Sequence, residues 1–359
     1  PAAATVNWTN TDGTIGVSTS GSGDIASFNG INSGLTPASG NFSATSTLNG
    51  CTSAPGTFTI TIDPMPTLSA VPTQTLCAGD PTTLITFTYS PAGSTVNWTN
   101  TDGTIGIGTS GAGDIFSFTG TNNTLLPVSG NFSATATLNN CTSTPETFTI
   151  TVNPVPTLAG VTSQSVCAGN PTSTVTFTPS PVASTVNWTN SDATIGIGGS
   201  GSGDIISFNG ANAGPGTASG NFSATATLAG CTSDPQTFTV TVNPLPVPTA
   251  SATSPNGTFC VNGTFVLDVT PTGMASYSWT GPLSYTSTVQ TNTVTLISVP
   301  MSGIYNVTVV DNNGCTAAAT TNVVVNPLPT PIAGDNDPCL GNTLNLTVTN
   351  ASSWSWTGP

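Results

Sequence analysis

The sequence predicts an all-β protein made of tandem β-sandwich domains, and three observations support this. First, apolar and polar residues alternate with period two in the stretch GNFSATATLNNCTSTPETFTITVNP (130–154), which is typical of half-buried strands. Second, this stretch recurs at 40–64 and 220–244, and in a looser form at 302–327. Third, helix formers are scarce, whereas Thr, Val, Ser, Asn and Gly abound.

Each copy of the stretch is interpreted as a β-hairpin. In the copy at 130–154, residues 131–138 and 147–152 form the two alternating strands. The turn falls at Asn139 and Asn140, because Asn tolerates the positive φ of tight hairpins. Pro154 ends the second strand, because proline has no N–H to donate to a ladder. The hairpin therefore carries Cys141 at its tip and a proline stop at its foot.

Internal repeats define the expected domains. The prolines that end the copies, at 64, 154, 244 and 327, are followed by short proline-rich linkers, which act as semi-rigid spacers. Pro1 falls in the middle of a repeat and the last span stops early, so we expect a window on a longer array. The expected domains, called the first to fifth repeats below, are 1–64 (partial), 65–154, 155–244, 245–327 and 328–359 (partial).

Within a complete domain we expect about seven strands. In the second repeat these include segments 82–90, 95–100, 104–110 and 114–120 ahead of the hairpin. Short strands, frequent turn signals and a Cys…Trp…Cys order favour an immunoglobulin-like sandwich. The aromatic residues that recur in these strands are expected in the core rather than on a ligand platform: Trp8, Trp98, Trp188, Trp279, Trp356, Phe132, Phe222 and Tyr305.

The composition excludes several classes of function. The chain has no Lys, Arg or His, and its net charge is −14. Most acid–base and nucleophile-activation schemes need His or Lys, so we do not expect an enzyme. Nucleic-acid binding depends on Lys and Arg, so no nucleic-acid partner is expected. No run of ~20 apolar residues is present, so we expect no membrane insertion.

The few carboxylates recur in turns, as Asp12, Asp102 and Asp192 do in the TNTDGT-like segments. Asp in such turns accepts hydrogen bonds from the backbone that follows it, and we expect that role here. Calcium is the alternative, but it requires six to eight oxygen ligands and the sequence has no DxDxDG loop. We therefore expect no cofactor and no catalytic or metal-binding residues.

One combination of motifs resembles a known family. It consists of Cys77-Ala-Gly, Trp98, Phe132, Cys141 and an Asn-Pro-Val-Pro exit at 153–156. This pattern is similar to the tandem immunoglobulin-like and PKD-like repeats of very large Bacteroidetes cell-surface adhesins. These adhesins are secreted by the type IX system and include the SprB-like filaments of gliding bacteria. The first three repeats resemble the PKD-like variety and the fourth the shorter immunoglobulin-like variety.

The resemblance implies a structural stalk or filament segment that presents a distal adhesive tip for surface attachment or gliding motility. It implies a secreted protein on the cell surface, attached to the outer membrane through regions outside this chain. The implied partners are neighbouring repeats, cell-envelope motility or secretion machinery, and extracellular surfaces or polysaccharides. Two alternatives stay open: the repeats bind glycans or surfaces directly, or the chain is a processed filament subunit assembled by strand donation.

The eight cysteines recur regularly without His or a CxxC pair, which indicates disulfides in an extracellular protein. One pairing lies within domains and the other joins neighbouring domains. In an immunoglobulin-like fold the two cysteines of a domain would lie at opposite ends, roughly 20–25 Å apart, which is the argument for the second pairing; both pairings stay open. The candidates for the first are Cys77–Cys141, Cys167–Cys231 and Cys260–Cys315; those for the second are Cys77–Cys231 and Cys167–Cys315, and Cys51 and Cys339 are expected to pair outside this segment.

Overall fold

The chain is all-β, as expected, in a computed structural model that describes residues 3–337 and 339–357. The ends of the expected first and fifth domains lie outside the described residues. The chain divides into two compact units, Pro1–Ala159 with Phe177–Asn187 and Ala224–Gln236, and Gly160–Thr176 with Trp188–Ser223 and Thr237–Pro359. The helical elements among the described residues are short 3₁₀ turns: η1 (Gly13–Ile15), η2 (Gly103–Ile105), η3 (Ala193–Ile195), η4 (Pro282–Ser284) and η5 (Val299–Met301).

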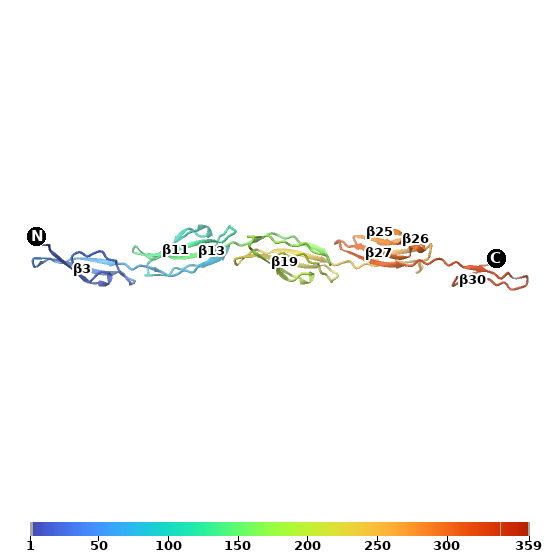
Figure 1. Ribbon diagram of the computed structural model, residues 1–359, viewed down its shortest axis with the longest axis horizontal. Helices are drawn as coiled ribbons and strands as arrows, with labels where there is room; N and C mark the ends of the chain where they lie inside the picture. The colour runs from blue at the N-terminus through green and yellow to red at the C-terminus, as the bar shows by residue number, and fades with distance from the viewer. Residues whose placement is uncertain (1–2, 338, 358–359) are drawn as a thin grey trace. The chain divides into compact units, whose positions relative to one another are not determined.

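In the first unit, the second repeat is a sandwich whose larger layer is a six-stranded sheet (Figure 1). The strands follow the order β10-β9-β11-β13-β7, with β12 paired to β11. β7 runs parallel to β13, so that Cys77 lies beside Asn153, and the other pairs are antiparallel. The bounds are β7 (Gln74–Cys77), β9 (Thr95–Asn100), β10 (Ser110–Ala112), β11 (Val128–Leu138), β12 (Cys141–Thr142) and β13 (Glu146–Asn153).

The smaller layer of this sandwich is irregular, which corrects the expected strands. β6 (Thr67–Leu68) pairs with β8 (Tyr89–Ser90), but segments 82–90 and 114–120 share only one isolated bridge, Ile85–Ile115, and a second bridge joins Pro81 to Thr119. Side chains replace ladder bonds there, since the Asp114 carboxylate accepts the Phe87 N–H. Segment 104–110 is likewise not a strand: it begins in η2, which the Asp102 side chain caps.

The core of the second repeat lies between these two layers. Phe132 and Phe148 stack with their ring centroids 4.8 Å apart, and Phe87 of the smaller layer covers Phe148. Trp98 packs beside Phe132. The alternating residues of the hairpin are therefore buried on one face, which explains the period of two in the sequence.

The first repeat contains the same hairpin sheet without the parallel strand. Its order is β2-β1-β3-β4, with β5 paired to β3, and its buried core is limited to Trp8, Ile15 and Phe42.

The first unit also includes the pair β14–β16 and the tip strand β20 of the third repeat. The bounds are β1 (Thr5–Asn10), β2 (Ser20–Ser22), β3 (Ala38–Leu48), β4 (Cys51–Thr52), β5 (Gly56–Ile62), β14 (Thr157–Leu158), β16 (Pro179–Ser180), β17 (Thr185–Asn190) and β20 (Cys231–Thr232).

In the second unit, the remaining part of the third repeat has the same parallel pairing, between β15 and β21. The fourth repeat has seven strands in two antiparallel sheets, ordered β22-β23-β26 and β25-β24-β27-β28, around Phe265, Trp279 and Tyr305. Seven strands in two sheets are the immunoglobulin-like arrangement, so the expected fold class is confirmed. In the fifth repeat β29 pairs with β30.

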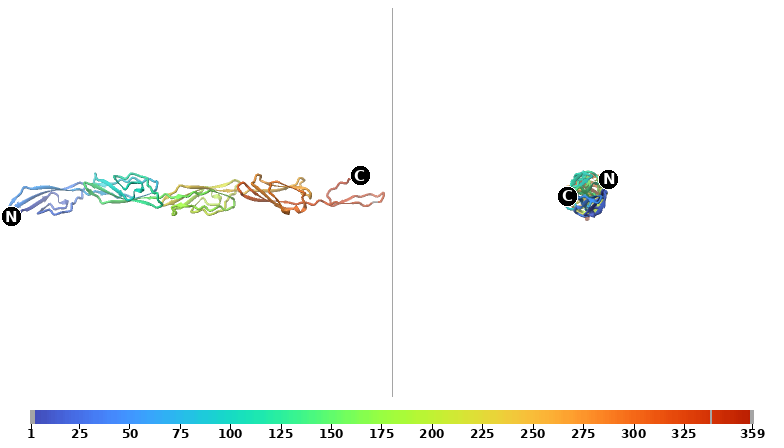
Figure 2. Two further views of the ribbon diagram at one scale, coloured as in Figure 1. Left: turned by 90° about the horizontal axis from the view of Figure 1, so that it is seen from above. Right: turned by 90° about the vertical axis from the view of Figure 1, so that its left-hand side faces the viewer.

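Figure 1 labels β25, β26, β27 and β30 of this unit, and Figure 2 shows the same ribbon turned by 90°. The bounds of the strands in this unit are β15 (Gln164–Cys167), β18 (Ser200–Ser202), β19 (Ala218–Leu228), β21 (Gln236–Asn243), β22 (Thr249–Thr253), β23 (Thr264–Thr270), β24 (Ser276–Gly281), β25 (Tyr285–Ser287), β26 (Asn292–Thr295), β27 (Gly303–Val310), β28 (Thr316–Val323), β29 (Ile332–Gly334) and β30 (Thr347–Thr349).

Candidate functional site

A disulfide joins Cys77 of the second repeat to Cys231 of the third, with 5.6 Å between their Cα atoms. Cys77 ends β7, and the next N–H, of Ala78, donates to the Asn153 carbonyl at 2.9 Å. Cys231 directly follows the turn of the next hairpin, at Ala229 and Gly230, where φ is 49° and 85°. The bond therefore ties the end of one sheet to the hairpin tip of the next repeat, and we call such a bond a staple.

Asn153 adds a polar contact beside this staple. Its side chain is buried, and its Nδ2 donates to the carbonyl oxygen of Ala229 at 3.1 Å. A buried amide needs such a partner, because an unpaired one costs free energy. The Asn-Pro foot of one hairpin thus contacts the tip of the next, next to the sulfur bridge.

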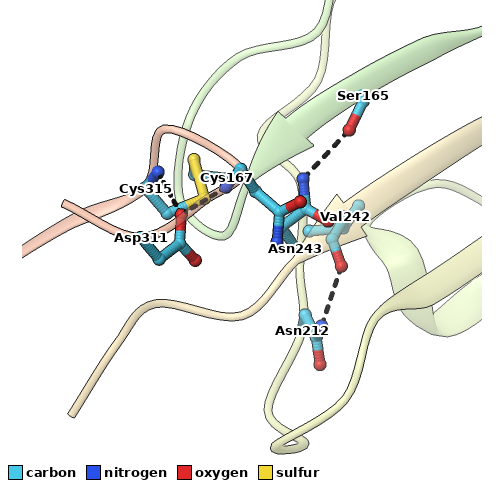
Figure 3. Close-up of a disulfide and its surroundings, with 8 residues drawn as sticks. Ser165, Cys167, Asn212, Val242, Asn243, Asp311 and Cys315 are labelled. Carbon is cyan, nitrogen blue, oxygen red and sulfur yellow. Dashed lines mark hydrogen bonds between the residues drawn. A yellow bond between two sulfur atoms is a disulfide. The ribbon is translucent and has the colours of Figure 1, made fainter. Parts of the chain in front are cut away.

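The second staple joins Cys167 to Cys315 in the second unit (Figure 3). Cys167 ends β15 and lies beside Asn243 in the parallel pair. The Asp311 carboxylate accepts the N–H groups of Asn313 and Cys315, at 2.9 and 2.8 Å, and so fixes the turn that presents Cys315. Asn243 donates here to Ser165 Oγ at 2.9 Å, within its own sheet. Both bonded hairpin cysteines, Cys231 and Cys315, are buried.

The pairing within domains is wrong, because the two cysteines of one domain lie at opposite ends of its sheet. In the second repeat Cys77 lies beside Asn153, near where Val128 pairs with β13, whereas Cys141 pairs with Leu138. Val128 and Leu138 are ten strand positions apart, or about 34 Å. Disulfides require Cα atoms within about 7 Å. Cys167–Cys231 and Cys260–Cys315 are excluded as well, because Cys231 is bonded to Cys77 and Cys315 is bonded to Cys167.

Four cysteines are free thiols in the structure: Cys51, Cys141, Cys260 and Cys339. Cys141 occupies the hairpin-tip position of a staple, and the adjacent Asn139 donates from its Nδ2 to Asp63 of the first repeat at 3.0 Å. Cys260 occupies the other position, since it bridges in parallel to Asn326 at the end of the fourth repeat. Cys141 and Cys260 therefore each lie at a staple position without a bonded partner. The pairing of Cys51 and Cys339 outside this segment stays a prediction.

The expected core aromatics of the first four repeats lie in the interior. Trp8, Trp98, Trp188, Trp279, Phe132, Phe222 and Tyr305 are all buried. Each of the four tryptophans has a buried indole N–H without a hydrogen-bond partner, which suits packing rather than ligand recognition. Trp356 is the exception, with 45% of its surface exposed, and among the described residues β29 and β30 form a sheet of two strands only.

The recurring aspartates have turn roles. The Asp102 carboxylate accepts from the Thr104 hydroxyl at 2.6 Å and from the Thr104 N–H at 2.8 Å. The hydroxyl first, and then the amide, hold the pKa of Asp102 below its usual value. Asp12 and Asp192 make the same contacts. In the described part of the chain, no three metal-ligating side chains gather in one place.

Two structural residues in each of the first three repeats were not singled out from the sequence. Ser143 of the Cys-Thr-Ser tip accepts the buried N–H of Ala136 at 3.0 Å. Gly111 lies opposite Trp98, where a Cβ would come within 2.1 Å of the indole ring. Their signal was present in the sequence, because both recur with the 90-residue period.

No helix among the described residues is long and apolar enough to cross a membrane. No protein-family model matches the chain, and no curated protein matches it.

Solved structures with some likeness to the chain include three tandem-domain proteins. Dpr2 Ig1-Ig2 in complex with DIP-Theta Ig1-Ig3 is 10% identical, with a TM-score of 0.34, over 74% of this chain and 100% of that one. The eight N-terminal Ig domains of Down Syndrome Cell Adhesion Molecule are 14% identical, with a TM-score of 0.33, over 93% and 45%. Mouse cadherin-23 EC22-24 is 13% identical, with a TM-score of 0.34, over 74% and 99%. Likeness at this level says nothing about function.

Proposed function

We propose that this chain is a force-transmitting stalk segment of a large cell-surface adhesin. The observation that carries the proposal is the overlap of the two staples. One closes the chain between Cys77 and Cys231, and the other between Cys167 and Cys315. Because the two loops share residues 167–231, the third repeat is bonded covalently to both of its neighbours.

The overlap shortens the covalent path along which tension travels. Pulled from both ends, the chain is loaded from Cys77 to Cys231, back through the third repeat to Cys167, and on to Cys315. With both disulfides intact, the loaded path contains only the 64 positions between Cys167 and Cys231. Without them it contains the 238 positions between Cys77 and Cys315. At ~3.5 Å per extended residue, it reaches about 220 Å instead of about 830 Å. A stalk built in this way resists lengthening even after its sandwiches unfold.

The wider setting follows from composition and resemblance. A sequence without Lys, Arg or His cannot form side-chain ion pairs with its own carboxylates, and covalent ties suit a secreted protein. The resemblance to gliding-bacteria adhesins favours a stalk that presents a distal adhesive tip, attached to the outer membrane through other regions. Its partners would be neighbouring repeats of the same type and the cell-envelope machinery. We further propose that the domain boundaries fall at Pro64, Pro154, Pro244 and Pro327.

Single-molecule pulling on the full chain, held at its two termini, tests this function. With the staples intact we expect the fully unfolded chain to be about 600 Å shorter than after reduction. The matched control is the double variant C51S/C141S, which keeps both staples and should retain the short length. An equal final length before and after reduction would contradict the proposal.

A second candidate function is direct glycan contact by the second repeat. A shallow hollow there is lined by Tyr89, Asn97 and Asp114, and the Tyr89 ring is partly exposed. An aromatic face beside amide and carboxylate groups suits a sugar ring. A glycan array probed with the full chain and with Tyr89→Ala tests it. Binding that the substitution abolishes would support this candidate, and the absence of binding would reject it.

A further inference from the structure

Two covalent connections leave the same end of the second repeat. Cys77 ends β7 and lies beside Asn153, the last residue of β13, because the two strands are parallel. The disulfide to Cys231 starts from the first of these residues, and the peptide bond to Pro154 starts from the second. The third repeat is therefore attached to two adjacent strands of the second.

The third repeat passes tension on through a strand pair of the same kind. The bonded Cys231 leads through β20 and β21 to Asn243, and the incoming peptide chain leads from Pro154 to Cys167 at the end of β15. β15 and β21 are parallel, and Cys167 lies beside Asn243. The residues of β21 already rise ~3.3 Å each, against at most ~3.6 Å when a chain is pulled straight. This line of tension therefore has little length to give.

The remaining residues of the two repeats lie on neither line. We call residues 78–140 the body of the second repeat and residues 168–230 the body of the third. Each body begins directly after the cysteine that ends the parallel strand, and it ends directly before the cysteine of the hairpin tip. Tension that enters the second repeat at β6 reaches Cys77 and the disulfide without passing through its body. The bodies are therefore not in series with the strands that carry the load.

The bodies also hold the side chains that are most open to a protease. Between Cys77 and Asn243, every large apolar side chain that is more than half exposed lies in a body. These side chains are Leu84, Phe116, Leu125, Leu126, Val182 and Ile206. Proteases specific for Lys or Arg have no site in this sequence, but proteases that recognise large apolar residues do. Exposed loops are where chains are cut first, so cleavage of this part of the chain is expected in the bodies.

We propose that the bodies are mechanically dispensable, so that a stalk cut by a protease in either body still transmits tension. Hydrolysis breaks one peptide C–N bond: the carbonyl carbon takes the hydroxyl of water, the nitrogen takes its proton, and the sulfur bridges stay intact. A cut in the second body lies inside the loop that Cys77–Cys231 closes, and a cut in the third lies inside the loops of both staples. This inference rests on the proposed stalk function and adds tolerance of a cut to it.

The test introduces one cut at a chosen place in the full chain. The recognition sequence of a site-specific protease is inserted between residues 125 and 126 in the second body, or between residues 215 and 216 in the third. All four residues are exposed and lie outside the strands. Before cleavage, each variant should unfold at the thermal midpoint of the parent chain, which shows that the insertion itself is harmless.

Single-molecule pulling on the cut chains, held at their two termini, measures the outcome. The chain cut at 125 should reach the final length of the uncut chain, because the 64 positions between Cys167 and Cys231 are intact. The chain cut at 215 should reach about 70 Å further, because its shortest path is now the 84 positions between Cys231 and Cys315. The control has the same insertion between residues 72 and 73, outside both loops, and should part once it is cut.

A body-cut chain that parts, or a cut at 215 that leaves the final length unchanged, would overturn the proposal. Limited digestion of the parent chain with thermolysin gives a second measurement without any insertion. Chains cut next to Phe116 or Ile206, identified by mass spectrometry, should stay in one piece on a denaturing gel until they are reduced. Fragments that separate without reductant would also refute it. Failure of the stalk function itself would look different, because the uncut chain would then be equally long before and after reduction.

Discussion

At the scale of single residues, the close contact between a glycine and a tryptophan fixes the core of each of the first three repeats. Gly111 lies opposite Trp98, and a Cβ there would come within 2.1 Å of the indole. The same contact recurs at Gly21 with Trp8 and at Gly201 with Trp188. Glycine is therefore required by the volume of the tryptophan ring, which no pattern of strand periodicity reveals.

Gly111→Ala is expected to destabilise the second repeat by roughly 1–3 kcal/mol, because the added methyl group overpacks the core. Urea unfolding followed by tryptophan fluorescence measures the effect. Gly108→Ala is the control, since the nearest atom to its Cβ would be 3.9 Å away. A G111A variant as stable as the G108A variant would show that the ring moves aside freely.

A second prediction at this scale concerns pH. The Thr104 hydroxyl and amide lower the folded-state pKa of Asp102 below the ordinary 3.8. Between the two pKa values the unfolded chain holds more protons, so the free energy of unfolding rises with pH there. The stabilisation is present above pH 3.8 and is lost as pH falls through the folded-state pKa.

Thr104→Val removes the hydroxyl donor, which is the larger cause of the shift. An NMR titration should find the pKa of the Asp102 carboxyl closer to 3.8 in this variant. The acid-induced loss of stability should shrink accordingly. Thr99→Val, at an exposed position of β9, is the control and should leave the titration unchanged. No change in the T104V titration would mean that the amide alone sets the pKa.

At the scale of elements, the hairpin has an interruption that a single serine bridges. β12 pairs with β11 at Thr137 and Leu138, and β13 pairs with it only up to Ala134. The buried N–H of Ala136 falls between the two ladders and donates to Ser143 Oγ. Ser143 also returns its own N–H to the Ala136 carbonyl at 2.8 Å.

Ser143→Ala should cost about 1–3 kcal/mol, because it leaves the Ala136 N–H buried without a partner. Thermal or urea unfolding of the full chain measures this. Ser129→Ala is the matched control: Ser129 makes an exposed side-chain hydrogen bond to Thr151, and its loss should stay within about 0.5 kcal/mol. If both serines prove equally dispensable, water reaches the interruption.

This hairpin also shows how far the sequence predicts the fold. Its two strands, its turn at Asn139 and Asn140 with φ of 47° and 69°, and its stop at Pro154 follow from local patterns. The smaller layer was not predictable in the same way, because Asp114 and Thr82 replace ladder bonds with side-chain bonds there. The alternation of apolar and polar residues indicates strands paired by backbone hydrogen bonds. It does not show where side chains take the place of those bonds.

At the scale of the whole chain, the staples show a different limit of sequence reasoning. Spacing alone left two pairings open for Cys77, because it does not say at which end of the sheet each cysteine lies. The parallel pairing of β7 with β13 settles the question by placing Cys77 at the foot of its own hairpin and far from its tip. The partner is therefore a cysteine 154 positions away in the next repeat.

Removal of one staple with C77S/C231S should destabilise the chain by an amount that grows with the logarithm of the length of the loop that the disulfide closes. For a loop of this length the chain-entropy model gives up to about 5 kcal/mol, and the overlap with the second staple makes the effect smaller. We expect a lower thermal midpoint for the second and third repeats. A similar loss is expected for C167S/C315S, which removes the disulfide that closes a loop of 148 positions. The control C51S/C141S removes two free thiols and should leave the midpoint unchanged. If C77S/C231S and the control unfold together, the polar contact between Asn153 and Ala229 holds the junction without the sulfur bridge.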